Sequence, residues 1–399
     1  MANKPKIRFK GFDDAWEQRK LGDLVGIYDG VHQTPEYQDS GIMFLSVENI
    51  ATLKSEKYIS KEAFERDYKV YPEKGDILMT RIGDVGTTNV VETAKKVAFY
   101  VSLALLKPNG INSYFLSNAM KTNAFQKGLR ERTLVTAIPQ KINKDEIGKI
   151  DIFITNNDVE QQKIGAYFST LDHLITLHQR KCDQMKELKK YMLKKMFPQN
   201  GAKVPEIRFD GFTDDWEQRK LNELLEKYED PVDTPHNGYE RIGIRSHAKG
   251  TFHSFVEPGK ELDTAKMHRV ASDKFILNIT FAWEHAVAIT DENDAGKLVS
   301  HRFPQFSFDE KLKSHFFKYL MLDRKFKEHL ELSSPGGAGR NRVLKISDML
   351  KYEIKIPSIG EQTKIAKYLD ELDHLITLHQ SKCENLKNLK KYMLRNMFV

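Results

Sequence analysis

Cysteine is nearly absent from this sequence: its 399 residues include only Cys182 and Cys383. Two cysteines in a chain of this size do not form a disulfide framework. No apolar run approaches the ~20 residues that a membrane-spanning helix needs. The first residues, MANKPKIRFKGF, have no apolar stretch after their lysines. We therefore expect neither a membrane segment nor a secretory signal, and we predict a cytoplasmic protein.

Motifs of nucleotide chemistry are absent as well. No two prolines are adjacent, which excludes the Asn/Asp-Pro-Pro-Tyr/Phe motif of adenine methyltransferases. The sequence also has no GxxxxGK[ST] phosphate loop. No group of acidic and basic residues has the spacing of a nuclease site. We therefore predict that this chain is not an enzyme.

The composition is that of a globular, basic protein. Hydrophobic residues make up 40% and aromatic residues 10%, and the length allows two or three domains. The formal net charge is +7 and the isoelectric point is about 9.0. A basic balance of this kind favours polyanionic partners, nucleic acid first.

Two segments of the chain occur twice. EQQKIGAYFSTLDHLITLHQ opens the stretch 160–197, and EQTKIAKYLDELDHLITLHQ opens its counterpart at 361–398. IRFKGFDDAWEQRKLGDL at 7–24 returns as IRFDGFTDDWEQRKLNEL at 207–224. The sequences between these repeats barely resemble each other. Repeated segments that enclose dissimilar sequences predict that the protein recognises two different targets at a fixed separation.

The longer repeat has the pattern of a helix. Its first copy lacks proline, and apolar residues recur at steps of three and four through Ile164, Phe168, Leu171 and Ile175. This period is typical of a coiled-coil seam, and a helix of this length spans ~57 Å. We expect the two copies to pack antiparallel on each other, with PQNGAKVPE at 198–206 as a short connection.

The unlike stretches have the pattern of α/β (α+β) domains. Runs rich in Ile, Leu, Val and Phe at 74–83 and 238–246 predict strands. Residues 111–131 and 310–332 each predict one amphipathic helix. We divide the chain into a first domain with its frame segment, a first spacer helix, a linker, a second domain and a second spacer helix: 1–155, 156–198, 199–206, 207–356 and 357–399.

In this order and twice over, these features resemble a type I restriction-modification specificity subunit. The resemblance is carried by IRFxGFxxxW from Ile7 and Ile207, by KGDIL at 74–78, and by EQxKI from Glu160 and Glu361. It implies two similar target recognition domains in a pseudo-two-fold arrangement, each reading one half of a bipartite, asymmetric site on double-stranded DNA. The paired helices would set the gap between half-sites and dock methyltransferase subunits.

The resemblance also implies partners. Two methyltransferase (modification) subunits and two motor-nuclease (restriction) subunits would assemble with this chain. S-adenosylmethionine, ATP and Mg²⁺ would belong to those partners, and no cofactor would bind to this chain.

Polar loops that precede the last strand of each domain are the first candidates for DNA contact. Base edges are read mostly by Arg, Lys, Asn and Gln, and other basic residues hold phosphates. An ordinary basic surface loop is the alternative. The candidates in the first domain are Arg130, Arg132, Thr136, Gln140, Lys141 and Asn143, and those in the second are Ser334, Arg340, Asn341, Arg342 and Lys345.

A second group of candidates flanks predicted strands. It comprises Thr80 and Arg81 in the first domain, and Arg241, Arg245, His247 and Lys249 in the second. Surface charge beside a buried strand would explain these residues equally well. The lysines of the long helices are most simply a solvated face, with DNA or an acidic partner as the other options.

One pattern is compatible with zinc. His178 and Cys182 are four residues apart on one predicted helix, and His379 and Cys383 repeat that spacing. An antiparallel pair of helices could bring four ligands together. Cysteine and histidine that simply fill a helix seam are the preferred interpretation, so we predict no metal.

Two rival functions differ from DNA recognition. A coiled-coil assembly scaffold without intrinsic DNA specificity would show no sequence-dependent affinity for DNA. A self-contained enzyme, such as a fused restriction-methylation protein, would need the catalytic motifs that this sequence lacks.

Overall fold

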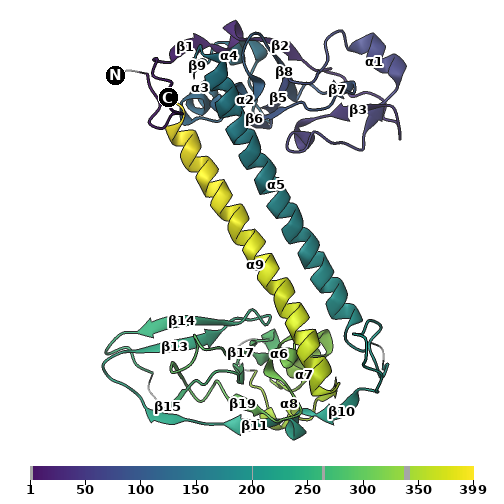
Figure 1. Ribbon diagram of the computed structural model, residues 1–399, viewed down its shortest axis with the longest axis vertical. Helices are drawn as coiled ribbons and strands as arrows, with labels where there is room; N and C mark the ends of the chain where they lie inside the picture. Colours follow the sequence, from purple (N-terminus) through teal and green to yellow (C-terminus); the bar gives the residue numbers. More distant parts are fainter. Residues whose placement is uncertain (1–2, 200, 263–265, 337–341) are drawn as a thin grey trace. The chain divides into compact units, whose positions relative to one another are not determined.

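The computed structural model describes residues 3–199, 201–262, 266–336 and 342–399. Its internal contacts divide the chain into two compact units (Figure 1). The first unit comprises residues 1–180 and 379–399, and the second comprises residues 181–378. Each unit therefore contains a globular part and a portion of each long helix.

The first unit is built from sheets followed by short helices. Its main sheet is antiparallel, with the order β2 (Val25–Asp29), β8 (Leu103–Pro108), β5 (Ile77–Ile82) and β6 (Asp84–Val90). A smaller sheet joins β4 (Tyr58–Ile59), β3 (Ile42–Leu45) and β7 (Val97–Phe99), with α1 (Lys61–Asp67) following β4 in the chain. Then come α2 (Ser113–Ala119), α3 (Asn123–Arg132) and α4 (Lys144–Gly148).

The second unit has a main sheet of the same kind. Its order is β11 (Leu225–Tyr228), β19 (Gln305–Phe308), β16 (Phe275–Leu277) and β17 (Val287–Ile289). Its other large sheet is ordered β12 (Pro231–Asp233), β15 (Lys266–Arg269), β18 (Leu298–Val299), β13 (Tyr239–Ile244) and β14 (Thr251–Val256). The helices α6 (Ser314–Leu320), α7 (Arg324–Leu332) and α8 (Ile346–Met349) correspond to α2, α3 and α4.

The same two-stranded frame closes both globular parts. In the first unit, β1 (Glu17–Lys20) pairs antiparallel with β9 (Asp151–Ile154). In the second, β10 (Glu217–Lys220) pairs in the same register with β20 (Glu353–Ile356). The main sheets match, whereas the remaining sheets have three and five strands. The units are therefore α/β (α+β) domains that share a scaffold and differ in what it carries.

The two long helices are α5 (Asp158–Lys195) and α9 (Ile359–Asn396), each of 38 residues. Each begins and ends two residues before the repeated stretch that predicted it, 160–197 or 361–398. Within the first unit they run antiparallel: as the residue number rises along α9, the number of its contact residue on α5 falls. His379 Nδ1 lies 2.9 Å from His178 Nδ1, Lys390 binds Asp172, and Phe398 contacts Phe168. The expected antiparallel pairing is thus present in this unit.

The expectation of single helices at 111–131 and 310–332 is wrong. Each stretch forms two helices, because a capping residue starts a new one. Thr122 Oγ1 accepts a hydrogen bond from the Phe125 backbone N–H at 3.4 Å. Asp323 plays the same part before α7, accepting from the Lys325 N–H at 3.3 Å.

A buried ion pair fastens the start of each long helix to the frame. Glu160 is fully buried and accepts from Arg8 Nε at 2.5 Å and Arg8 Nη2 at 2.8 Å. Glu361 is 1% exposed and accepts from Arg208 in the same bidentate way. The hydrogen bond to Glu160 raises the pKa of Arg8 above its usual value. Bidentate pairing of this kind fixes both side chains in one orientation.

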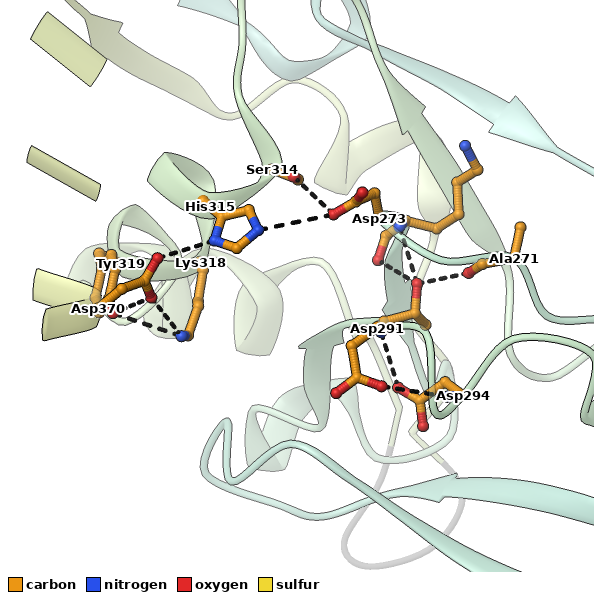
Figure 2. Close-up of polar contacts among 11 residues, drawn as sticks. Ala271, Asp273, Asp291, Asp294, Ser314, His315, Lys318, Tyr319 and Asp370 are labelled. Carbon is orange, nitrogen blue, oxygen red and sulfur yellow. Dashed lines mark hydrogen bonds and ion pairs between the residues drawn. The ribbon is translucent and has the colours of Figure 1, made fainter. Parts of the chain in front are cut away.

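A second polar network occurs in the second unit, where it joins α6 to the helix pair. Asp370 accepts from the Tyr319 hydroxyl at 2.6 Å, from Lys318 at 2.9 Å, and binds His315 Nδ1 at 2.9 Å (Figure 2). The same hydroxyl lies 2.9 Å from Asp373, which also binds Lys189. Burial favours a higher pKa for Asp370, but these hydrogen bonds outweigh burial and lower it. Asp370 is therefore an anion held by three donors.

Arg8→Ala tests the frame ion pair. The substitution leaves the Glu160 carboxylate buried without its partner, so the free energy of unfolding should fall by about 3 kcal/mol. Urea denaturation followed by circular dichroism measures the change. Lys149→Ala, which opens an exposed pair with Glu146, is the control and should have little effect. Equal losses in the two variants would contradict a special role for the buried pair.

Candidate nucleic-acid interface

In the first unit, both groups of expected DNA-contacting residues meet at one turn. The segment after α3 folds back onto the turn between β5 and β6. Ile142 N–H donates to the Arg81 carbonyl at 3.0 Å, and Gly83 N–H donates to the Gln140 carbonyl at 2.9 Å. The Gln140 side chain also donates a hydrogen bond from Nε2 to the Gly83 carbonyl at 3.0 Å. Residues far apart in sequence thus form one surface.

The exposed side chains of this surface mix charge with apolar groups. Arg130, Thr136, Lys141 and Asn143 are exposed. Arg132 is half-buried and donates to the Gly128 carbonyl at 3.1 Å. The tip of the loop also exposes Ile138 completely and Val135 by 70%. These two apolar residues were not among the expected contacts, because their hydrophobicity alone predicts burial.

Thr80 and Arg81 have internal partners instead of a solvent-facing position. Thr80 is fully buried, and its hydroxyl donates to Asp84 Oδ2 at 3.0 Å. Arg81 is 7% exposed, binds Asp29 Oδ1 at 2.6 Å, and donates to the Val101 carbonyl at 2.9 Å. Thr80 holds the β5–β6 turn, and Arg81 links β5 to β2, so we do not carry them forward as DNA contacts.

The second unit builds its surface at the corresponding turn, which follows β16. Leu344 N–H donates to the Ile279 carbonyl at 2.9 Å, the counterpart of the bond between Ile142 and Arg81. His247 N–H donates to the Glu284 carbonyl at 2.9 Å in the η4 turn (Ala282–Glu284). The two expected groups of the second domain therefore also converge on one turn.

The candidate residues of this second surface differ in their exposure to solvent and in their hydrogen-bond partners. His247, Lys249 and Lys345 are exposed. Arg241 is exposed and donates to Ser254 Oγ at 3.0 Å. Ser334 is buried and donates to the Leu330 carbonyl at 2.7 Å, so it is not a surface residue. Arg340 and Asn341 lie outside the described residues.

Aromatic rings support two of the arginines. The Arg342 guanidinium lies 5.4 Å from the centre of the Trp283 ring, and that of Arg245 lies 5.5 Å from the Phe252 ring. Phe252 is 42% exposed and Phe255 is 56% exposed. Trp283 is half-buried beside Arg342. Stacking of this kind fixes the orientation of a guanidinium, and Arg342 Nη1 also lies 3.4 Å from Glu331 Oε1.

Within the part of the chain that the structure describes, no group of three or more potential ligands could hold a metal ion. The Nδ1 atoms of His178 and His379 lie 2.9 Å apart, a hydrogen-bonding distance. Cys383 Sγ lies 3.6 Å from Gln179 Oε1 and 3.9 Å from the Ile175 carbonyl. These side chains contact other groups of the helix pair. No described helix has the length and hydropathy of a membrane span.

Comparison with known proteins decides the family. The model of the family "Type I restriction modification DNA specificity domain" matches residues 13–187 and again residues 213–388. The chain belongs to the type I restriction-modification DNA specificity family. Within this family the chain is a specificity subunit, which is non-catalytic, and other subunits carry the catalysis. The expectation that the chain is not an enzyme is therefore confirmed by family membership.

One relative is similar in sequence, and one solved structure is similar in fold. A protein described as the MjaX type I restriction enzyme specificity subunit of Methanocaldococcus jannaschii is 26% identical over 98% of this chain and 95% of its own length. The crystal structure of a type I restriction-modification S subunit from M. genitalium aligns with a TM-score of 0.64 at 13% identity, over 99% of both chains. The second similarity concerns the fold alone.

Thr80→Val tests the structural role of the buried turn residues in this specificity subunit. Loss of the hydroxyl leaves the Thr87 N–H and the Asp84 carboxylate without a partner, which should lower the free energy of unfolding by about 1–2 kcal/mol. Urea denaturation measures that loss, and competition between DNA duplexes measures the sequence preference. Unchanged stability with an altered preference would show that Thr80 reads DNA.

Proposed function

We propose that each unit of this specificity subunit reads one half of a bipartite, asymmetric site on double-stranded DNA. One observation carries the proposal: equivalent turns in the two units gather unlike sets of exposed basic, polar and aromatic side chains. In the first unit this surface surrounds Gly83, and in the second it surrounds Trp283. Because the two surfaces lie at equivalent positions of a shared scaffold, both are suited to the same kind of partner, DNA. Because their side chains differ, they are suited to two different DNA sequences.

The residues proposed to contact DNA are the exposed or half-exposed members of the two surfaces. Basic side chains among them would hold phosphates or bind base edges, while the polar side chains would reach bases. The full proposed set also retains two residues outside the described part of the chain. It comprises Arg130, Arg132, Thr136, Gln140, Lys141 and Asn143 in the first domain, and Arg241, Arg245, His247, Lys249, Arg340, Asn341, Arg342 and Lys345 in the second.

The long helices have a proposed part in spacing and assembly. A 38-residue helix is about 57 Å long at 1.5 Å per residue. Half-sites one DNA turn apart are separated by about 34 Å, so helices of this length suffice to set a gap between two readers. We propose that they also dock two modification subunits, and that two motor-nuclease subunits complete the assembly. S-adenosylmethionine, ATP and Mg²⁺ would bind to those partners.

Exchange of one domain tests the two-reader proposal. Replacing residues 25–155 with the corresponding domain of another specificity subunit should change one half-site and leave the other intact. Mapping the methylated sites in cells that contain the modification subunit provides the readout. The reciprocal exchange of residues 225–355 is the matched control and should change only the other half. The proposal fails if either exchange alters both halves or neither.

Arg342→Ala separates base reading from phosphate binding. If the guanidinium over Trp283 binds a base edge, affinity for the cognate site should fall by about 10–100-fold and discrimination at one position should relax. If it binds a phosphate, all sequences should weaken alike and the salt dependence should decrease by about one ion. Fluorescence anisotropy at several salt concentrations distinguishes these results.

The control is Arg324→Ala, since this exposed arginine on α7, paired with Glu328, is not part of the surface proposed to contact DNA. It should change neither the affinity nor the salt dependence. If Arg342→Ala behaves like this control, Arg342 does not contact DNA.

A further inference from the structure

The first unit contains a cavity of about 620 Å³ where the start of α3 meets the helix pair. Five cationic side chains line it, and Asp172 is its only carboxylate side chain: the cations are Lys121, Lys387, Lys390, Lys391 and Arg395. Four of these cations come from α9, and the fifth comes from the turn before α3. The cavity is outside both surfaces proposed to read DNA.

Most of this positive charge is unpaired. Lys390 Nζ binds Asp172 Oδ1 at 2.5 Å. Among the residues that the structure describes, Lys121, Lys387, Lys391 and Arg395 form no ion pair. Like charges brought together without counter-charges repel each other, and a bound anion would relieve that repulsion.

Lys121 is the member most affected by its surroundings. Its side chain is half-buried. Burial and the neighbouring charge of Lys390 lower its pKa to about 8, although Asp172 acts in the opposite direction. An anion bound in the cavity would stabilise the charged, protonated form of such a lysine.

The start of α3 adds neutral donors to the same wall. Asn123 and Ala124, the first residues of this ten-residue helix, line the cavity. Their backbone N–H groups have no carbonyl acceptor within the helix. Oxygen atoms of an anion could accept from these groups as well as from the lysines.

The second unit offers an internal comparison. A cavity of about 420 Å³ overlaps the equivalent place in part. It is lined by Lys194, Leu322 and Asp323 where the first unit has Arg395, Lys121 and Thr122, but not by the equivalents of Lys387, Lys390 and Lys391. The apolar Leu322 thus stands in place of the cation Lys121, and the anion Asp323 stands in place of the neutral Thr122. The cations Arg324 and Lys325 also line this cavity, but Arg324 is paired with Glu328.

The neighbouring network of the second unit is also balanced. Asp370 and Lys318, bound to each other at 2.9 Å (Figure 2), stand where the first unit has Ser169 and Ser117. Lys189, the equivalent of Lys390, binds Asp373 and lies 5.2 Å from the centre of the Tyr319 ring. Four cationic side chains and two carboxylates line the cavity of the second unit, against five and one in the first, so the net positive charge is larger in the first unit.

We propose that the cavity of the first unit binds a phosphate group. A phosphate group has more negative charge and more acceptor oxygens than a single carboxylate, so it suits four unpaired cations and the neutral donors at the start of α3 better. The phosphate group is the recognised chemistry, whether it is free orthophosphate or part of a nucleotide. The equivalent cavity of the second unit, with Asp323 in its wall, does not bind it.

Calorimetric titration of the full-length protein tests this site. Orthophosphate and ATP are titrated separately at constant ionic strength, set with sodium chloride. Each should bind with a stoichiometry of one, and each should displace the other. Lys121→Leu, which copies Leu322 of the second unit, should weaken both at least about tenfold. Binding of either anion with unchanged affinity to Lys121→Leu would overturn the proposal, as would the absence of binding to the unaltered protein.

A matched pair of variants assigns the binding to one unit. Arg395→Ala should weaken phosphate, whereas Lys194→Ala, at the equivalent position of the second unit, should not. Circular dichroism establishes that each variant is folded. Equal effects of the two variants would contradict a site confined to the first unit.

The pH dependence provides a second readout. Sulfate, which stays divalent throughout, should bind more weakly as the pH rises from 7 to 9, because Lys121 loses its proton near pH 8. The other charged side chains that line the cavity are Lys387, Lys390, Lys391, Arg395 and Asp172. Lys121→Leu should remove the pH dependence. A dependence that persists in this variant would exclude Lys121 as a ligand.

Discussion

The buried carboxylate at the start of each long helix is the constraint on which the rest of the protein depends. Glu160 and Glu361 have almost no contact with solvent, so each needs a cation at a fixed place. Arg8 and Arg208 provide it from segments 152 and 153 residues earlier in the chain. Because the two ends of each globular part are joined in this way, the sequence between them can change without disturbing the frame.

That freedom explains why the units agree in some places and differ in others. The frame strands pair in the same register, and the main sheets have the same strand order. The remaining sheets have three and five strands, and the surfaces around Gly83 and Trp283 differ in chemistry. Even the cavities beside the helix pair differ, since Lys121 and Leu322 occupy equivalent positions. A duplicated specificity subunit can thus gain a new property in one half only.

The sequence is a good guide to features that rest on local pattern. The steps of three and four from Ile164 onward predict α5 and α9 to within two residues, and the repeats predict two similar domains. Features that depend on contacts between residues far apart in the chain are harder to predict from the sequence. The burial of Arg81 depends on Asp29, which lies 52 residues away, and no sequence pattern separates such an arginine from a surface one. The cation cavity likewise requires α9 to meet the turn at Lys121. The helix break at Thr122 was missed because an amphipathic pattern continues across it.

The central claim is that one chain carries two different readers on one duplicated frame. The most direct test is to map, at single-base resolution, the DNA sites that are methylated in cells containing this subunit and its modification partner. The account predicts a site of two specified blocks with unrelated sequences, separated by a gap of constant length and unspecified bases. A single continuous block, two blocks of identical sequence, or methylation without sequence preference would contradict it.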